Sequence, residues 1–426
     1  MRRQRGLVGL TGLAALVGWG LVTQPAVAQV VTTEQSASIL VFPKVIADGS
    51  RDTIIQITNT SNNMQYAHCF YVDGAPTTPG YPPGSLNEPL CTEIDFDIWL
   101  TRQQPTHWVV STGRLYNPSD LACSGTTTTC VKGTSGSPAA DCCDAGFDPG
   151  HVPPVAPDFT GELMCIAVDP SGGPAFANVL KGEATLEDVI TVPGLFTAGD
   201  VSKYNAIGIQ SGEYASEAAY TDVLCLGSNA ATFDPTLCPY GKEYAGCPVE
   251  WRFDHPATGA PDPVVQQQTF CPSTCACPDG GPDTCKCNCS SVSTNLTVVP
   301  CTQNFETQAL TAVTLRFEVL NEFEQAFTTS TSFACWGSFD LGAPSGSLLP
   351  GISPWFTASV LGSDTLQTRI SSATGTPGGV LAVIEETHED TVNSLTARSA
   401  QNGDMIGELN VADLVTIPPE QGAVNQ

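Results

Sequence analysis

Six cysteines in one short segment have the spacing that most suggests chemistry in this sequence. A Cys-x3-Cys-x-Cys run is followed by Cys-x-Cys-x-Cys, at Cys271, Cys275, Cys277, Cys285, Cys287 and Cys289. Thiolates spaced this closely can hold soft metal ions such as Zn²⁺ or Cu(I). Structural zinc sites usually use wider Cys-x2-4-Cys pairs, however, and an oxidising compartment consumes thiols before metal arrives. We therefore interpret the six as disulfide-forming residues of an exposed loop and assign no metal site.

The other residue types that commonly carry catalysis lack catalytic spacing. The five histidines form no His-x-x-x-His or His-Glu-x-x-His pair, and the sequence has no Gly-x-Ser-x-Gly elbow and no Gly-x-x-x-x-Gly-Lys loop. Asp95 and Asp97 alternate with apolar residues, which places both on the solvent side of a strand. Asp48 and Asp52 bracket a turn without a calcium-loop motif around them. We expect no catalytic residue and no cofactor.

The N-terminus indicates the compartment in which the cysteines react. Arg2, Arg3 and Arg5 precede an apolar stretch at 6–22, and Ala26-Val27-Ala28 then supplies a small-x-small cleavage pattern. This order is typical of a secretory signal peptide, residues 1–28. All 18 cysteines follow it, so disulfides are expected in preference to free thiols. No later segment is long and apolar enough to span a bilayer. We expect an extracellular, cell-surface or periplasmic protein.

Charge limits the partners that this chain can bind. The formal net charge is −27, and removal of the three signal arginines makes it more negative. Nucleic acids and anionic membranes both require basic surfaces, so neither is expected as a partner. The expected partner is an unknown surface or extracellular ligand. The sequence leaves the oligomeric state open.

Short strands separated by turns predict an all-β fold. In the first strand-rich region, Thr53, Ile55 and Ile57 share one face, and similar runs recur to about residue 190. A Thr-, Gly- and Pro-rich stretch at about 117–158 carries Cys123 and Cys130 and is interpreted as a disulfide-pinned insertion. A Cys-rich, loop-rich segment spans 191–293, and strands return at 294–418. The predicted architecture is two tandem antiparallel β-sandwiches, 36–190 and 294–418, joined by the middle segment.

The second strand-rich region is interpreted as a repeat of the first. Apolar residues precede Asn321 at the same offsets at which Thr53, Ile55 and Ile57 precede Asn59. Pro43 and Pro300 each end an earlier apolar run. The agreement of these offsets is informative, because a shift by one residue would turn every side chain of a strand to the other face. Convergence of generic strand patterns is the alternative.

One segment resembles a known class of module. Residues 38–72, with Phe42-Pro43 and the run 57–61, are similar to the opening of immunoglobulin-like modules in uncharacterised secreted bacterial proteins. The resemblance implies the sandwich fold and export, and carries over no catalytic residue. It further implies a Cys69–Cys165 bridge like the inter-sheet disulfide of immunoglobulin domains. The second region lacks a match for Cys165, so Cys335 must pair elsewhere, with Cys301 as the candidate.

Two function classes follow from these observations. The favoured one is a non-catalytic exported surface or envelope protein, structural or partner-binding through its loops, and not an enzyme. The alternative is a secreted hydrolase whose active site has no local motif. A deep pocket with converging acidic or histidine side chains would favour the hydrolase.

Overall fold

The structure is a computed structural model that describes thirteen stretches of the chain. They are residues 30–75, 90–114, 152–169, 172–189, 200–212, 223–227, 244–260, 290–310, 312–343, 356–372, 378–390, 395–406 and 413–418. The expected signal peptide, the expected insertion with Cys123 and Cys130, and the six cysteines at 271–289 lie outside the described residues. Within these stretches the helical structure is the short α3 (Ala358–Leu361), and no helix there is long and apolar enough to cross a membrane.

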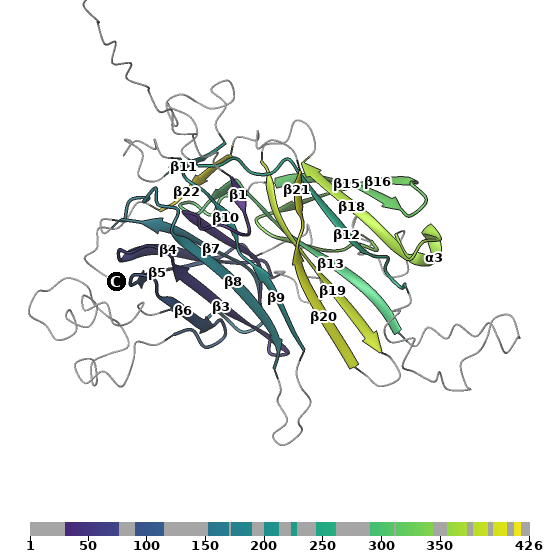
Figure 1. Ribbon diagram of the computed structural model, residues 1–426, viewed down its shortest axis with the longest axis horizontal. Coiled ribbons are helices and arrows are strands. Elements are labelled where there is room, and N and C mark those ends of the chain that lie inside the picture. The colour runs from purple at the N-terminus through teal and green to yellow at the C-terminus, as the bar shows by residue number, and fades with distance from the viewer. Residues whose placement is uncertain are drawn as a thin grey trace, which may run out of the picture.

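Strands from the first half of the chain form a six-stranded sheet and an adjacent four-stranded sheet (Figure 1). The six-stranded sheet comprises, in spatial order, β1 (Val31–Thr32), β10 (Ile207–Ile209), β2 (Ile39–Ala47), β7 (Phe159–Val168), β4 (Gln65–Asp73) and β5 (Glu93–Leu100). The first four-stranded sheet comprises β6 (Pro105–Val109), β3 (Arg51–Asn59), β8 (Leu180–Asp188) and β9 (Val201–Asn205).

Three further sheets are built mainly from later strands. The second four-stranded sheet comprises β17 (Gly337–Asp340), β13 (Ser290–Pro300), β19 (Val380–Asp390) and β20 (Leu395–Asn402). The five-stranded sheet comprises β16 (Ala326–Ala334), β15 (Ala312–Asn321), β18 (Thr365–Ser372), β12 (Glu250–Pro256) and β21 (Asp404–Ile406). The three-stranded sheet comprises β11 (Val223–Leu226), β22 (Asp413–Thr416) and β14 (Gln303–Asn304).

The all-β prediction is confirmed, but the prediction of two tandem immunoglobulin-like sandwiches is wrong. The five small sheets are arranged in the manner of a five-bladed β-propeller. The segment expected to be a loop-rich connector supplies β9, β10, β11 and β12 to four of these sheets. This segment is therefore part of the folded structure and not only a connector.

Burial on both faces of the six-stranded sheet explains why the prediction of two sandwiches is wrong. In β2, Ile39 and Val41 belong to one apolar cluster and Leu40 and Phe42 to another, on opposite faces. All ten residues of β7 are buried. A strand that is covered on both faces reads as a continuous apolar run, whereas a two-layer sandwich leaves one face of each sheet to water. The first cluster also contains residues of β13, β15 and β19, so one core joins early and late strands.

Strand pairing in the two regions shows parallels that bear on the repeat. β2 pairs antiparallel with β7, and β13 pairs antiparallel with β19. Asn59 and Asn321 each end a strand, and the side-chain oxygen of each accepts a hydrogen bond from the backbone N–H two residues later. The internal duplication stays a prediction, as do the residue boundaries assigned to the regions.

Candidate functional site

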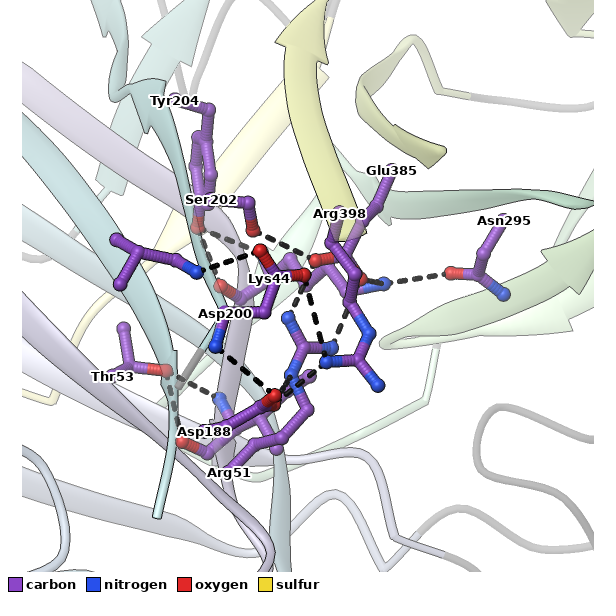
Figure 2. A network of polar contacts seen from close by, with 12 residues as sticks. Lys44, Arg51, Thr53, Asp188, Asp200, Ser202, Tyr204, Asn295, Glu385 and Arg398 are labelled. Carbon is purple, nitrogen blue, oxygen red and sulfur yellow. Dashed lines mark hydrogen bonds and ion pairs between the residues drawn. The ribbon is translucent and has the colours of Figure 1, made fainter. Parts of the chain in front are cut away.

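A buried cluster of charged residues lies where the first four-stranded sheet, the six-stranded sheet and the second four-stranded sheet meet (Figure 2). Its three cations and three carboxylates come from β2, β3, β8, β19 and β20 and the residue before β9, and they are Lys44, Arg51, Arg398, Asp188, Asp200 and Glu385. Because the cations and carboxylates are equal in number, their mutual attraction offsets part of the free energy needed to remove them from water.

A β-bulge turns Lys44 into this cluster. The register between β2 and β7 shifts between Phe42 and Val45, and Pro43 in that interval has no N–H for the ladder. The backbone at Lys44 is held by Tyr204, whose hydroxyl donates to the Lys44 carbonyl (2.6 Å) and accepts from its N–H (3.1 Å). The bulge also leaves the Pro43 carbonyl free to accept the indole N–H of Trp336 (2.7 Å). The bulge therefore directs both residues toward late strands.

Glu385 is the centre of the cluster. Its carboxylate receives two hydrogen bonds from the Arg51 guanidinium (2.5 and 3.0 Å) and one from the Ser202 hydroxyl (2.8 Å), and it lies 3.0 Å from Lys44 Nζ. Burial alone would raise the pKa of Glu385, but Lys44 and Arg51 hold it well below its ordinary value. Glu385 is thus a carboxylate with four donors around it. Its side chain is only 4 % exposed, so no external substrate reaches it.

For the pKa of Lys44, the effect of burial outweighs the attraction of the neighbouring carboxylate. Burial lowers its pKa, and the attraction of Glu385 only partly offsets this effect. Its Nζ also donates to the side-chain oxygen of Asn295 on β13 (2.9 Å). With a side chain 7 % exposed, Lys44 can react only with groups inside the protein.

A shallow pocket lies on the surface beside the Cys91–Cys335 disulfide. Its empty volume is about 350 Å³, part of which is open solvent, and Glu93, Gln303 and Gln308 are among the polar side chains in its lining. Partial burial raises the pKa of Glu93 to about 7.

Two further buried carboxyls keep their protons more readily than usual. Burial raises the pKa of Glu162 to about 8, and Gln303 donates to one of its oxygens. Burial raises the pKa of Asp413 to about 6, and this carboxyl receives the Thr302 hydroxyl and the Gly379 N–H. Ligand atoms of Cys247, Cys301 and Asp413 lie within 4.8 Å of one another, but the two sulfurs form a disulfide and supply no thiolate for a metal.

Three disulfides between described residues place four of the predicted cysteines, Cys69, Cys165, Cys301 and Cys335. Cys69 and Cys165 are bonded, as the resemblance implied, but they join the neighbouring strands β4 and β7 of one sheet instead of two sheets. The proposed Cys335–Cys301 pair is wrong, because Cys335 bonds Cys91 and Cys301 bonds Cys247. Cys91 and Cys247 were not among the candidates, since sequence spacing carries no information on bridges over such distances.

The acidic and histidine residues considered from the sequence do not converge. Asp95 and Asp97 are exposed, as predicted, and Asp97 bonds His68 (2.7 Å). Asp48 accepts the N–H groups of its own turn. Buried His255 bonds Thr368 (2.8 Å), and burial lowers its pKa to about 4, so it is neutral.

Sequence reasoning missed the residues of the buried cluster. One signal was available, because Lys44 interrupts the apolar run of β2 and Glu385 follows the apolar run of β19. A charge within a buried strand requires a partner, so these two residues could have been singled out.

Comparisons with known proteins show no family. No protein-family model matches the sequence. No curated protein matches it either. Among solved structures, a crystal structure of Thermotoga maritima 1070 aligns with 41 % of this chain and 95 % of its own, at 8 % identity and a TM-score of 0.22. The cowpea mosaic virus top component aligns with 96 % of this chain and 98 % of its own, at 9 % identity and a TM-score of 0.16.

Proposed function

We propose that this chain is an exported protein of the cell surface, periplasm or extracellular medium, with a structural or partner-binding role. The Cys91–Cys335 bridge carries the proposal, because it joins residues 244 positions apart and one of its cysteines, Cys335, is partly exposed. Disulfides form and persist mainly in oxidising compartments, so this bridge supports export. The Cys69–Cys165 and Cys247–Cys301 bridges support the same conclusion.

Export is tested by fractionating cells that produce the full chain with a C-terminal tag. Thiols are blocked with a maleimide before denaturation, and mass spectrometry then reports the N-terminus and the blocked cysteines. We expect protein outside the cytoplasm, starting after Ala28, with almost no blocked cysteine. The double variant Arg3→Glu/Arg5→Glu, which removes the basic start of the signal, should stay in the cytoplasm. Wild-type protein retained there with free thiols would contradict the proposal.

A secreted hydrolase is the second candidate, and the pocket beside Glu93 is the observation that favours it. A carboxyl with a pKa near 7 suits proton transfer at neutral pH. Purified protein is assayed on ester, peptide and glycoside substrates beside its Glu93→Gln variant. Under the favoured proposal the two give the same background rate. Turnover by the wild type that Glu93→Gln abolishes would establish the hydrolase instead.

A further inference from the structure

Three side chains from three strands meet in the buried cluster in an arrangement suited to forming a covalent bond. Lys44 on β2 donates through Nζ to Asn295 Oδ1 on β13 (2.9 Å), and Glu385 on β19 lies 3.0 Å from the same nitrogen. The three are an amine, a carboxamide and a carboxylate. Figure 2 shows Lys44 between the other two.

The Asn295 amide is polarised as an electrophile. Its Oδ1 accepts the Ser338 hydroxyl (3.0 Å) and the Thr297 hydroxyl (3.3 Å) in addition to Lys44 Nζ. Donors directed at one carbonyl oxygen stabilise the negative charge that develops there when a nucleophile attacks the carbon. Asn295 is itself only partly buried, so a small leaving group has a route to solvent.

Lys44 has the environment of a nucleophilic amine. Burial shifts its pKa downward, which favours the uncharged form that attacks a carbonyl. Glu385 is within hydrogen-bond reach of its proton, and Arg51 and Ser202 fix the orientation of that carboxylate. Arg51 also keeps Glu385 ionised, so Glu385 is a weak base and the reaction should be slow.

We propose that Lys44 and Asn295 join in an intramolecular isopeptide bond, with Glu385 as the proton carrier. The Lys44 ammonium gives one proton to Glu385, and the amine attacks Asn295 Cγ. The attack forms the Nζ–Cγ bond, and collapse of the tetrahedral intermediate breaks the Cγ–Nδ2 bond. Glu385 returns its proton to the departing nitrogen and takes the second proton of Nζ. Ammonia leaves and receives this second proton, so the products are an amide and ammonium.

The bond would connect positions 251 residues apart, on opposite sides of the segment that was expected to separate two units. It needs no oxidant and no external enzyme, because all reacting groups belong to one chain. It would therefore hold the early and late strands together even after every disulfide is reduced.

The test is mass spectrometry of the full folded chain. We expect an intact mass lower by that of one ammonia, about 17 Da, after disulfide reduction. We also expect a branched tryptic peptide in which residues 287–316 are joined to the peptide that ends at Arg51 and is uncut at Lys44. Lys44→Met and Asn295→Ala should each abolish both signals. Glu385→Gln should abolish them while leaving both reacting groups in place.

Lys203→Met is the matched control. Lys203 also pairs with a carboxylate, Glu183 (3.5 Å), but on the surface, so this variant should keep the cross-link. Wild-type protein that melts cooperatively, yet yields separate unmodified peptides after prolonged incubation at alkaline pH, would overturn the proposal. Loss of the bond in Lys203→Met as well would overturn the assignment to Lys44.

Discussion

Glu385 is the negative charge that holds Arg51, and Lys44 before the cross-link forms, inside the protein. Removing one partner of a buried ion pair leaves an uncompensated charge, which typically costs about 3–5 kcal/mol. We expect Glu385→Gln to lower the free energy of unfolding by about this amount in urea titrations. A double-mutant cycle with Arg51→Met should show that the two substitutions are strongly coupled.

Arg252 and Asp404 supply the matched control for this prediction. They form an ion pair of similar length (2.8 Å) whose carboxylate side chain is 68 % exposed. Exposed pairs contribute about 1 kcal/mol or less, so Asp404→Asn should have little effect. If Glu385→Gln costs no more than Asp404→Asn, the cluster does not stabilise the fold.

Glu162 gives the protein a pH dependence with a defined sign. Its pKa is about 8 in the folded chain and near 4.5 as an ordinary glutamate, so the folded state binds more protons between these values. Stability must then fall as pH rises through this window, by up to a few kcal/mol. Asp413 adds in the same direction until about pH 6. The lowered pKa values of Glu385 and His255 act with the opposite sign. The contribution of Glu385 is already complete above the ordinary glutamate value, and that of His255 is complete above its ordinary value of 6.5, so the decrease toward pH 8 comes from Glu162.

Urea unfolding at about pH 5 and about pH 8 measures this dependence. We expect greater stability at the lower pH, and we expect Glu162→Gln to remove most of the difference, since the amide mimics the protonated acid. A Glu162→Gln variant with the full wild-type slope would show that the proton is bound elsewhere.

The sequence indicates some members of the buried cluster and not their partners. Lys44 within an apolar run is visible as an anomaly, and so is Glu385 after one. Their meeting depends on the bulge at Pro43 and on the packing of β2 against β13 and β19, and neither can be read from local periodicity. The long-range pairing of Lys44 with Glu385 is therefore visible only in the structure.

At the scale of elements, the three disulfides between described residues differ in access to solvent. Cys335 is partly exposed, whereas Cys69, Cys165, Cys247 and Cys301 are buried. Thiol–disulfide exchange requires access to a sulfur, so a mild thiol reductant should open Cys91–Cys335 first. Its large loop implies a stabilisation of up to about 5 kcal/mol. Alkylation with peptide mapping along a reduction series checks the order, and earlier labelling of Cys69 or Cys247 would contradict it.

Hydrophobic periodicity identifies the strands, but it does not show whether one or both faces of a sheet are covered. β15 alternates cleanly between buried and outward residues, and it lies in a sheet with one polar face, as its pattern indicates. β2 and β7 read as continuous apolar runs, which is the signature of a sheet covered on both faces. Residues 39–42 and 163–168 show this continuous apolar pattern. Apolar runs this short also fit an ordinary strand, so the pattern alone does not predict that both faces of the sheet are covered.

At the scale of the whole molecule, early and late strands share one interior. The largest apolar cluster contains Ile39 and Phe70 together with Phe317 and Ile384. β9 and β20 lie side by side (Figure 1). Asn205 on β9 and Asn402 on β20 exchange two hydrogen bonds. We therefore expect neither half to be stable alone.

Calorimetry of the exported, oxidised protein tests this shared interior most directly. We expect one unfolding transition whose calorimetric and van't Hoff enthalpies agree, because the strands before and after the middle segment cannot lose their packing separately. Two separable transitions, or a calorimetric enthalpy about twice the van't Hoff value, would mean that the chain contains two independent units.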